Sequence, residues 1–583
     1  MTNSKLFLSL LVAGAVATGT AQAQSLKDAK AAIQAEQYDK AKAMLQNLVQ
    51  KKAKDGENYF YLGRIHLIND KIDSAQIVFQ EGVTNAPKEK LNTVGLGIVD
   101  LEKGDVAAAE TKFATAAQGV GKKEYEVPYY IGRGYIDAPK PDYKKAVEYL
   151  TKAKELNAKD PMIPTALGDA YAGLRESSPA YVAYRDALAL DEKLLAPKIG
   201  QAIISRRAQA YDVVLEQLTT LAGENPEYGP IYRELAETYY LSSIKAPEEQ
   251  YREINQKAVD NYKKYLSLTG DASTDAKVRY ADFLVYSGNY DELKTVAQEL
   301  STVEGVDAKV YRYLGYISFL QDKDYAKSLE YMTTLFSKVD TARLIGRDYL
   351  YAGLANIIAG DAAKGAEYLK VAETKQTEDE NYDEEISETA FEYFKNGENE
   401  IAAKIFTIPA SNDSSDYFYD SNFYLGQIEY GIGSKLVTVP EGTELTPEEV
   451  AAKMTEAKPH LEAAVKSLGI VGDATKKEVV DKYKIPALYY KGLTELALDN
   501  VMYDPENAKG IFVDSFTKLL AAISASGKAE EEANKTYAAD AHNYIGYFAY
   551  LKGDNAKAKA EFAETLKLKP EDPFATQMVE AVK

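Results

Sequence analysis

The chain has 583 residues, of which 46% are hydrophobic and 27% charged, and its formal net charge is −20. This length exceeds one ordinary hydrophobic core, so several domains or a repeat array are expected. The acidic balance argues against nucleic acid as a partner, because duplex binding needs a basic surface. The sequence contains no cysteine, which excludes disulfides, thiolate catalysis and zinc–thiolate sites.

The N-terminal segment has the pattern of a bacterial secretory signal. Lys5 precedes an apolar run from Leu6 to Ala17, and the small-residue motif Ala21-Gln22-Ala23 follows. We expect a signal peptide over 1–23, cleaved after Ala23, because the apolar run is too short to span a bilayer. The alternative, a buried N-terminal helix, does not explain the basic residue and the small-residue motif together. The prediction is therefore export to the periplasm or cell envelope of a Gram-negative bacterium, with no transmembrane segment in the mature chain.

A helix–turn–helix framework then recurs along the chain. In the segment 58–87, Leu62-Gly63 lies on a first helix, Ala75 and Phe79 lie on a second, and Pro87 ends it. Close repeats of this framework are Leu96-Gly97 with Ala109 and Phe113, Leu167-Gly168 with Ala180 and Tyr184, and Ile545-Gly546 with Ala558 and Phe562. Such matches in phase, at about 34 residues per unit, indicate a repeat architecture. Small residues on facing helices predict close approach, with the aromatic ring filling the remaining space.

Three insertions and one interruption break the regular spacing. The segments 136–143 and 242–256 are expected to lengthen turns between helices, and an inserted loop is expected near 433–456. Within that loop Thr446, Pro447 and Glu449 have the pattern of an N-cap, N1 and N3, so a helix should begin at Pro447. These insertions are either functional or tolerated drift. Because Pro, Ser, Asn and Asp gather over 407–421, we predict an N-terminal array over 24–408 and a C-terminal array over 417–583.

The repeated residues resemble the tetratricopeptide repeat (TPR) family, whose pattern is Leu-Gly, a Tyr-like residue, Ala, an aromatic, Ala and Pro. The resemblance covers nearly all of the chain after residue 23. It implies an all-α fold: a right-handed superhelical solenoid of stacked antiparallel helix pairs, with first helices lining the concave side. The last segment, 571–583, is expected to form a capping helix.

The resemblance also implies which positions face the groove and contact a partner. These predicted partner-binding residues are Phe60, Arg64, Tyr129, Arg133, Arg233, Tyr240, Arg312, Tyr316, Phe423, Tyr430, Tyr547 and Tyr550. Aromatic and arginine side chains are the usual anchors of peptide-binding surfaces. The alternative for each tyrosine is packing between repeats. The lysine–asparagine clamp for a terminal carboxylate in some family members is not evident, since Arg64, Ile98, Arg133 and Asp169 occupy the asparagine position.

No pattern in the sequence indicates catalysis, a metal or a cofactor. The chain has three histidines, His66, His460 and His542, and no metal-ligand spacing links them. The acidic run over 377–385 lacks the glycine turn and distal glutamate of a calcium loop. The sequence therefore predicts a protein that is not an enzyme and needs no cofactor.

Two functions remain open from the sequence. The first is an exported scaffold that binds partner proteins or peptides in its concave groove, for instance within an envelope complex. The second is capture of a cell-envelope glycan or nutrient, suggested by the 45 tyrosines, whose rings can stack on sugars. Protein crosslinking and glycan binding would distinguish them.

Overall fold

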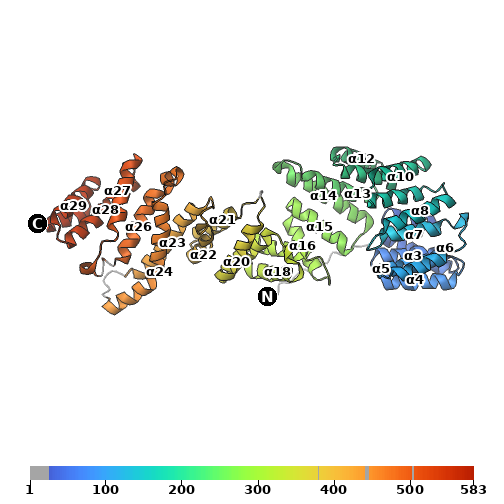
Figure 1. Ribbon diagram of the computed structural model, residues 1–583, viewed down its shortest axis with the longest axis horizontal. Helices are drawn as coiled ribbons and strands as arrows, with labels where there is room; N and C mark the ends of the chain where they lie inside the picture. Colours follow the sequence, from blue (N-terminus) through green and yellow to red (C-terminus); the bar gives the residue numbers. More distant parts are fainter. Residues whose placement is uncertain (1–24, 378–379, 440–444, 500, 502–503, 583) are drawn as a thin grey trace, which may run out of the picture. The chain divides into compact units, whose positions relative to one another are not determined.

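The computed structural model describes residues 25–377, 380–439, 445–499, 501 and 504–582, and these ranges contain helices and no strand. The chain forms two compact units, which comprise residues up to Val310 and from Tyr311 onward. Each unit is a succession of antiparallel helix pairs (Figure 1). The predicted all-α array of stacked helix pairs is confirmed.

The helices of unit 1 lie between the described N-terminus and residue 310. They are α1 (Leu26–Gln34), α2 (Tyr38–Lys51), α3 (Gly56–Ile68), α4 (Ile72–Asn85), α5 (Leu91–Glu102), α6 (Val106–Ala117), α7 (Glu126–Asp137), α8 (Tyr143–Leu156), α9 (Met162–Gly173), α10 (Ser177–Leu190), α11 (Leu195–Arg207), α12 (Tyr211–Glu224), α13 (Gly229–Ser243), α14 (Glu248–Thr269), α15 (Thr274–Ser287) and α16 (Tyr290–Ser301).

The helices of unit 2 follow, the first of them starting at the division between the units. They are α17 (Lys309–Leu320), α18 (Tyr325–Lys338), α19 (Gly346–Ile358), α20 (Ala362–Lys375), α21 (Tyr382–Lys395), α22 (Asn399–Ala410), α23 (Phe418–Val437), α24 (Pro447–Gly472), α25 (Lys477–Val479), α26 (Ile485–Leu498), α27 (Val513–Ser526), α28 (Glu532–Leu551), α29 (Asn555–Leu568) and α30 (Pro573–Ala581).

Each close repeat joins its two helices through a glycine on the first and an aromatic ring on the second. A Cβ atom added at Gly63 would lie 2.3 Å from the ring of Phe79, and one at Gly168 would lie 2.4 Å from the ring of Tyr184. No side chain larger than hydrogen fits there without displacing the ring. The predicted close approach of the small residues is therefore confirmed at these pairs.

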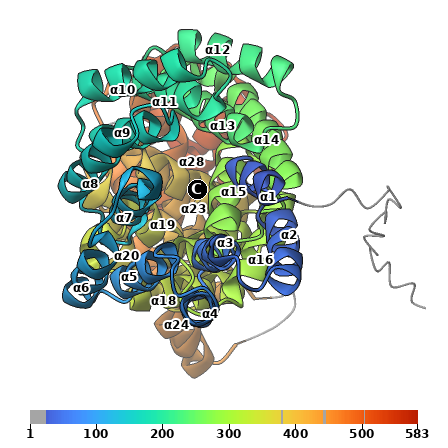
Figure 2. The same cartoon turned by 90° about the vertical axis from the view of Figure 1, so that its right-hand side faces the viewer.

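The two helices of a pair differ in burial, which separates an inner row from an outer one. Most residues of α3 are buried, including both polar and apolar positions, whereas in α4 only Ala75, Phe79 and Gly82 are buried. The first helices also pack on one another in succession: α3 on α5, α5 on α7, α7 on α9, α9 on α11 and α11 on α13. Figure 2 shows this row in unit 1, with α4, α6 and α8 outside it. The first helices therefore line the inner face of unit 1.

Two of the predicted loop insertions are mostly helix. The residues expected to lengthen the turn after Ser242 start α14, which is 22 residues long. In the region 433–456 the preceding helix α23 extends to Val437, and α24 then begins at Pro447 and is 26 residues long. The Thr446 hydroxyl accepts a hydrogen bond from the Glu449 backbone N–H, and the Glu449 carboxylate accepts from the Thr446 N–H, so the predicted capping box is confirmed. Residues 440–444 lie outside the described residues.

The division between the units differs from the predicted boundary near 409–416. Helix α22 ends at Ala410, α23 begins at Phe418, and the two helices pack on each other. Asn422 donates hydrogen bonds from its side chain to the carbonyls of Ala410 and Phe418, which fixes the short turn between them. The polar cluster there makes a turn within unit 2 rather than a domain boundary.

The C-terminal helix α30 covers the last helix pair, as expected. Its residues Ala575 and Met578 are buried against Ala558 and Phe562 of α29. Asp572 caps its first turn by accepting from the backbone N–H of Ala575.

Candidate functional site

The inner face of unit 1 contains a cavity of about 580 Å³. Its wall is built by α1, α3, α7 and α9, together with the segments that lead into α11 and α13. Because α1 belongs to the first helix pair and Tyr228 precedes α13, the cavity joins parts of the chain that are far apart in sequence. It is the best candidate site in the part of the chain that the structure describes.

Tyrosines form much of the apolar part of the cavity wall, together with aliphatic side chains such as Ile33, Met162 and Leu194. The rings of Tyr129 and Tyr130 meet edge to face, with centroids 4.8 Å apart, and Tyr130 also meets Phe60 at 4.7 Å. The hydroxyls of Tyr61 and Tyr130 are hydrogen-bonded to each other. Burial raises the pKa of Tyr129 to about 12, so its hydroxyl stays protonated at neutral pH and is a hydrogen-bond donor.

Most charged groups of the wall are paired with one another. Lys30 lies 3.4 Å from Glu57 and 3.7 Å from Glu126. Arg133 lies 2.5 Å from Asp169 and 2.7 Å from Asp137. Burial alone would lower the pKa of Arg133, but the two aspartates outweigh it and the net shift is upward.

Two further polar groups lie in the wall. The hydroxyl of Tyr125 donates to Asp160 at 2.8 Å, and Asp160 also accepts from the backbone N–H of Met162 at the start of α9. The guanidinium of Arg64 lies over the ring of Tyr130, 5.0 Å from its centroid. This arrangement is a cation–π contact.

The first helix pair reaches across unit 1 to α13. Glu36, in the turn between α1 and α2, accepts from Arg233 at 2.6 and 2.7 Å. The guanidinium of Arg233 also lies 5.4 Å from the ring centroid of Tyr265 on α14. In Figure 2, α1 accordingly lies beside α14. We call this contact between the α1–α2 turn and α13 the closing contact.

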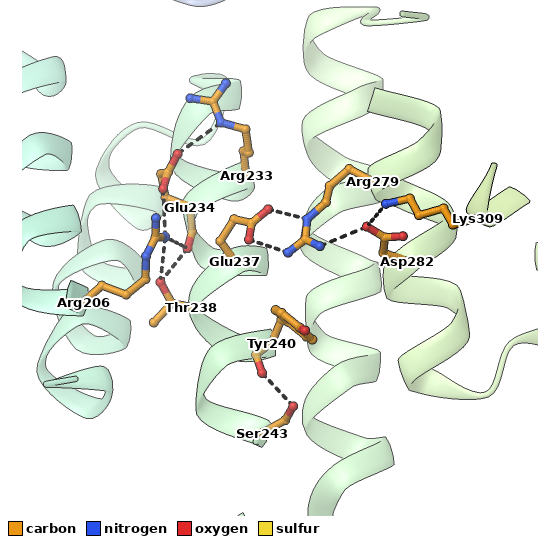
Figure 3. A network of polar contacts seen from close by, with 10 residues as sticks. All are labelled: Arg206, Arg233, Glu234, Glu237, Thr238, Tyr240, Ser243, Arg279, Asp282 and Lys309. Atoms are coloured by element: carbon orange, nitrogen blue, oxygen red, sulfur yellow. Dashed lines mark hydrogen bonds and ion pairs between the residues drawn. The ribbon is translucent and has the colours of Figure 1, made fainter. Parts of the chain in front are cut away.

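Beyond the closing contact, ion pairs join successive first helices (Figure 3). Arg206 of α11 lies 2.8 Å from Glu234 of α13, and Arg279 of α15 binds both oxygens of Glu237 at 2.6 and 2.7 Å. Lys309 continues the series with Asp282, at 2.9 Å. The pairs form two separate series, one around Glu234 and one from Glu237 through Arg279 and Asp282 to Lys309.

The predicted residues of unit 1 divide into three groups. Arg64, Tyr129 and Arg133 all line the cavity. Arg233 forms the closing contact, and Tyr240 stacks on Tyr286 with centroids 4.7 Å apart. Phe60 is fully buried in the core, so its assignment to the groove surface is corrected. Phe60 packs on Phe79, the framework aromatic of the same repeat, and this contact holds the Phe60 ring in the core.

Three of the six predicted residues of unit 2 are engaged within the unit. Asp348 accepts from Arg312 at 2.6 and 2.7 Å and from the hydroxyl of Tyr316 at 2.7 Å. Phe423 is buried against Tyr483, with centroids 4.6 Å apart, which corrects its assignment to the groove surface.

The other three unit 2 residues are more accessible. Tyr430 meets Tyr490 at 5.7 Å, and Tyr547 meets Phe574 at 5.8 Å. Tyr550 is 38% exposed. Their contact with a partner stays a prediction.

Several cavity residues were not predicted from the sequence. Tyr125 precedes Tyr129 by one helical turn and so shares its face, a signal that the repeat pattern contained. Asp169 holds the same repeat position as Arg133, 36 residues later, which makes the two neighbours on adjacent first helices. Lys193 and Tyr228 lie in turns outside the repeat framework, and no pattern marked them.

The described residues contain no group of three or more His, Asp or Glu side chains that could hold a metal ion. His460 and His542 each contact a glutamate, Glu429 and Glu561 respectively, at 2.6 Å on the neighbouring helix. None of the helices that the structure describes has the length and apolar character needed to cross a membrane.

Comparison with known proteins adds little. No protein-family model matches the chain, and no curated protein matches it. Among solved structures, a tetratricopeptide repeat protein from Parabacteroides merdae is 20% identical, with 45% of this chain and 96% of that chain covered and a TM-score of 0.29.

Two other solved structures are similarly distant. The C-terminal part of a TPR repeat-containing protein from Cytophaga hutchinsonii is 17% identical, with 52% and 98% covered and a TM-score of 0.26. The Cut9–Hcn1 assembly of the APC/C is 12% identical, with 95% of each chain covered and a TM-score of 0.29. Likenesses at these scores carry no information on ligand or partner.

Proposed function

We propose that this protein is a non-catalytic scaffold that binds partner proteins or peptides on the inner face of unit 1, centred on the cavity. The observation that carries the proposal is the cavity itself, where tyrosine rings and charged side chains from several helix pairs surround one open space. Its volume of about 580 Å³ suits a few side chains of a bound peptide. Aromatic and arginine side chains are the groups that contribute most to affinity in such surfaces.

The geometry of the tyrosines favours a peptide over a sugar. A sugar ring stacks on an open aromatic face, whereas Arg64 lies over the ring of Tyr130, and Tyr61 and Tyr129 each meet Tyr130 edge to face. We therefore propose peptide binding, and the experiment below also measures glycan binding as the alternative.

We also propose that the chain is exported and acts in the cell envelope of a Gram-negative bacterium. The support is the basic residue, the short apolar run and the small-residue motif of the first 23 positions. Mass spectrometry of the protein from fractionated cells tests this: a mature chain that begins at Gln24 in the periplasmic fraction is expected. A full-length chain in the cytoplasm would contradict the proposal.

The binding proposal is tested by selecting a phage-displayed random peptide library on the full-length chain. The substitution Ala196→Trp fills the cavity from an exposed position on its rim, so selected peptides should bind it more weakly than the parent. The matched control is Ala107→Trp, which adds the same ring at an exposed position of the outer helix α6 and should leave binding unchanged. Equal loss in both variants, or saturable glycan binding without peptide binding, would overturn the proposal.

A further inference from the structure

Lysines gather in three consecutive turns of unit 1, although the net charge of the chain is −20. The segments 51–55, 86–90 and 118–124 each join a second helix to the next first helix, and together they contain seven lysines and three acidic residues. We call this surface the basic edge. Its lysines are Lys51, Lys52, Lys54, Lys88, Lys90, Lys122 and Lys123.

Contacts place the three segments next to one another. Lys54 of the first segment and Lys88 of the second line the same surface hollow, which has a volume of about 720 Å³. Lys90 of the second segment donates to the backbone carbonyl of Gln118 in the third at 2.9 Å and lies 3.2 Å from Glu124. The basic edge is therefore one continuous surface over adjacent repeats rather than a set of isolated charges.

Most ammonium groups of the basic edge have no partner within the protein. Apart from Lys90, its lysines are exposed and make no ion pair and no side-chain hydrogen bond among the described residues. Two of the three acidic residues are engaged: Glu124 pairs with Lys90, and Glu89 is half-buried and accepts from the backbone N–H of Leu91 at 3.1 Å. The basic edge therefore carries positive charge that the fold leaves unneutralised.

Helix stability does not account for these lysines. A lysine in the last turn of a helix is favoured by the helix dipole, and Lys51 ends α2 in this way. Lys54, Lys90 and Lys123, however, lie within three residues before the start of α3, α5 and α7. A cation near a helix N-terminus is unfavourable, so an anionic partner outside the protein would offset a cost that the fold alone does not.

The composition of the basic edge favours a lipid surface over an acidic protein as that partner. Its three segments contain no arginine and no aromatic residue. Protein–protein interfaces are enriched in those residues and depleted in lysine. The lysine ammonium is a compact charge on a flexible stem, so a row of exposed lysines suits negative charge that has no fixed arrangement. The headgroups of anionic phospholipids present negative charge of that kind.

We propose that the basic edge attaches this protein reversibly to membrane surfaces that contain anionic phospholipids. The attraction is electrostatic, because unpaired ammonium groups on three adjacent turns approach the phosphate groups of several lipids at once. None of the seven lysines lines the cavity, so the inference goes beyond the proposed function and does not depend on peptide binding. Attachment through the basic edge determines which side of unit 1 faces the lipid.

Co-sedimentation with lipid vesicles tests this attachment. The protein is the mature chain proposed above, which begins at Gln24, because the apolar run from Leu6 to Ala17 would bind lipid by itself. The vesicles contain either phosphatidylcholine alone or an equal mixture of phosphatidylcholine and phosphatidylglycerol. We expect binding to the mixed vesicles only, and we expect about 0.5 M NaCl to release the protein because it screens exposed charges.

Protein variants then locate the attachment. The double variant Lys54→Gln/Lys88→Gln should bind the mixed vesicles at least about tenfold more weakly, because each lysine near an anionic surface contributes roughly fivefold to binding. The matched control Lys404→Gln/Lys466→Gln removes the same net charge from exposed side chains of α22 and α24 and should bind like the parent chain. Circular dichroism confirms that each variant is folded.

Three results would contradict the proposal. If the parent chain binds neither kind of vesicle, or binds both equally, the basic edge does not recognise anionic lipid. If the two double variants lose binding equally, the net charge of the chain is responsible rather than the basic edge. Each of these results leaves peptide binding in the cavity untouched, because the phage selection tests that proposal separately.

Discussion

Glu36 and Arg233 are 197 positions apart in the chain, and Arg233 donates to both carboxylate oxygens of Glu36. The repeats between them therefore bring the first helix pair back to α13 within unit 1. Gln34, also in the first helix pair, makes a second long-range contact: its side-chain nitrogen lies 3.7 Å from the sulfur of Met162 on α9. The cavity wall depends on this return, because Lys30 of α1 and Tyr228 before α13 both line it.

From the closing contact we predict that exchanging the charges of Glu36 and Arg233 in one double variant restores the protection that either single variant loses. Glu36→Arg and Arg233→Glu should each increase hydrogen exchange of the backbone amides in α1 and α2, because each leaves like charges facing each other at a partly buried site. The expected local cost is about 1–3 kcal/mol, the range for hydrogen bonds between charged groups. The double variant should restore most of the protection.

The control for this prediction is an exposed pair. Lys567 and Glu564 form an ion pair whose two side chains are both well exposed. The substitution Lys567→Glu removes this pair and should change the free energy of unfolding by less than about 1 kcal/mol. If the amides of α1 and α2 in the double variant lose as much hydrogen-exchange protection as the sum of the two single losses, Glu36 and Arg233 are not coupled.

The glycine–aromatic contacts predict a large effect from one methyl group. Gly63→Ala should lower the free energy of unfolding by about 1–3 kcal/mol, because its Cβ would enter the ring of Phe79. Gly223→Ala is the matched control: a Cβ there meets nothing within 4 Å, and the helix α12 should gain up to about 1 kcal/mol from the better helix former. Thermal melts of the two variants should move in opposite directions. Equal shifts would contradict the packing described here.

The contacts of Asp348 indicate that Arg312 and Tyr316 have a structural role. The side chain is fully buried and accepts from Arg312, from Tyr316 and from the backbone N–H of Ile345. Asp348→Asn should destabilise unit 2 by about 3 kcal/mol, because it leaves Arg312 without its countercharge.

Urea denaturation measures this effect, and Asp514→Asn supplies the comparison. That side chain is 71% exposed, so its loss should cost less than about 1 kcal/mol. A similar cost for both substitutions would mean that Arg312 and Tyr316 are not held by Asp348, and it would favour their predicted role in partner contact.

The tyrosines predict loss of stability at alkaline pH. Burial raises the pKa of Tyr129, Tyr228, Tyr351 and Tyr544 to about 12. The unfolded chain ionises its tyrosines near pH 10, so the folded state binds more protons between about pH 10 and 12. The stabilisation is therefore complete below about pH 10 and is lost as pH rises, by up to about 1.4 kcal/mol per pH unit for each buried tyrosine.

Ultraviolet titration of the phenol groups measures this directly, and the absence of tryptophan and cysteine removes the usual interference. The native chain should show a fraction of tyrosines that ionise only as the helical circular dichroism is lost. The urea-unfolded chain is the control and should titrate in one step near the ordinary value. A native chain that titrates in that same single step would contradict the prediction.

The repeat framework was readable in the sequence because each of its contacts is local. Gly63 and Phe79 lie in one helix pair, and the capping box of Thr446 and Glu449 lies within one turn, so periodicity and spacing determine both. The burial of Phe60 was misjudged because a first helix in this array packs on several sides, which leaves few of its positions on the inner surface.

The cavity and the closing contact were not readable in the same way. The meeting of Glu36 and Arg233 depends on the sum of small rotations over all the helix pairs between them, and no single repeat encodes that sum. The insertions were misjudged because the residues after Ser242 and around Val437 extend helices rather than form loops. Once the helix pairs are placed, the pairing of Arg133 with Asp169 follows from their shared repeat position.

The closing contact also orders events during biosynthesis. A chain that emerges from its N-terminus first presents Glu36 long before Arg233 has been made, so the first helix pair packs on α3 before the closing contact can form. The cavity is therefore complete only once α13 has been made, and a chain arrested before α13 carries the tyrosines of α3 and α7 without the closing contact.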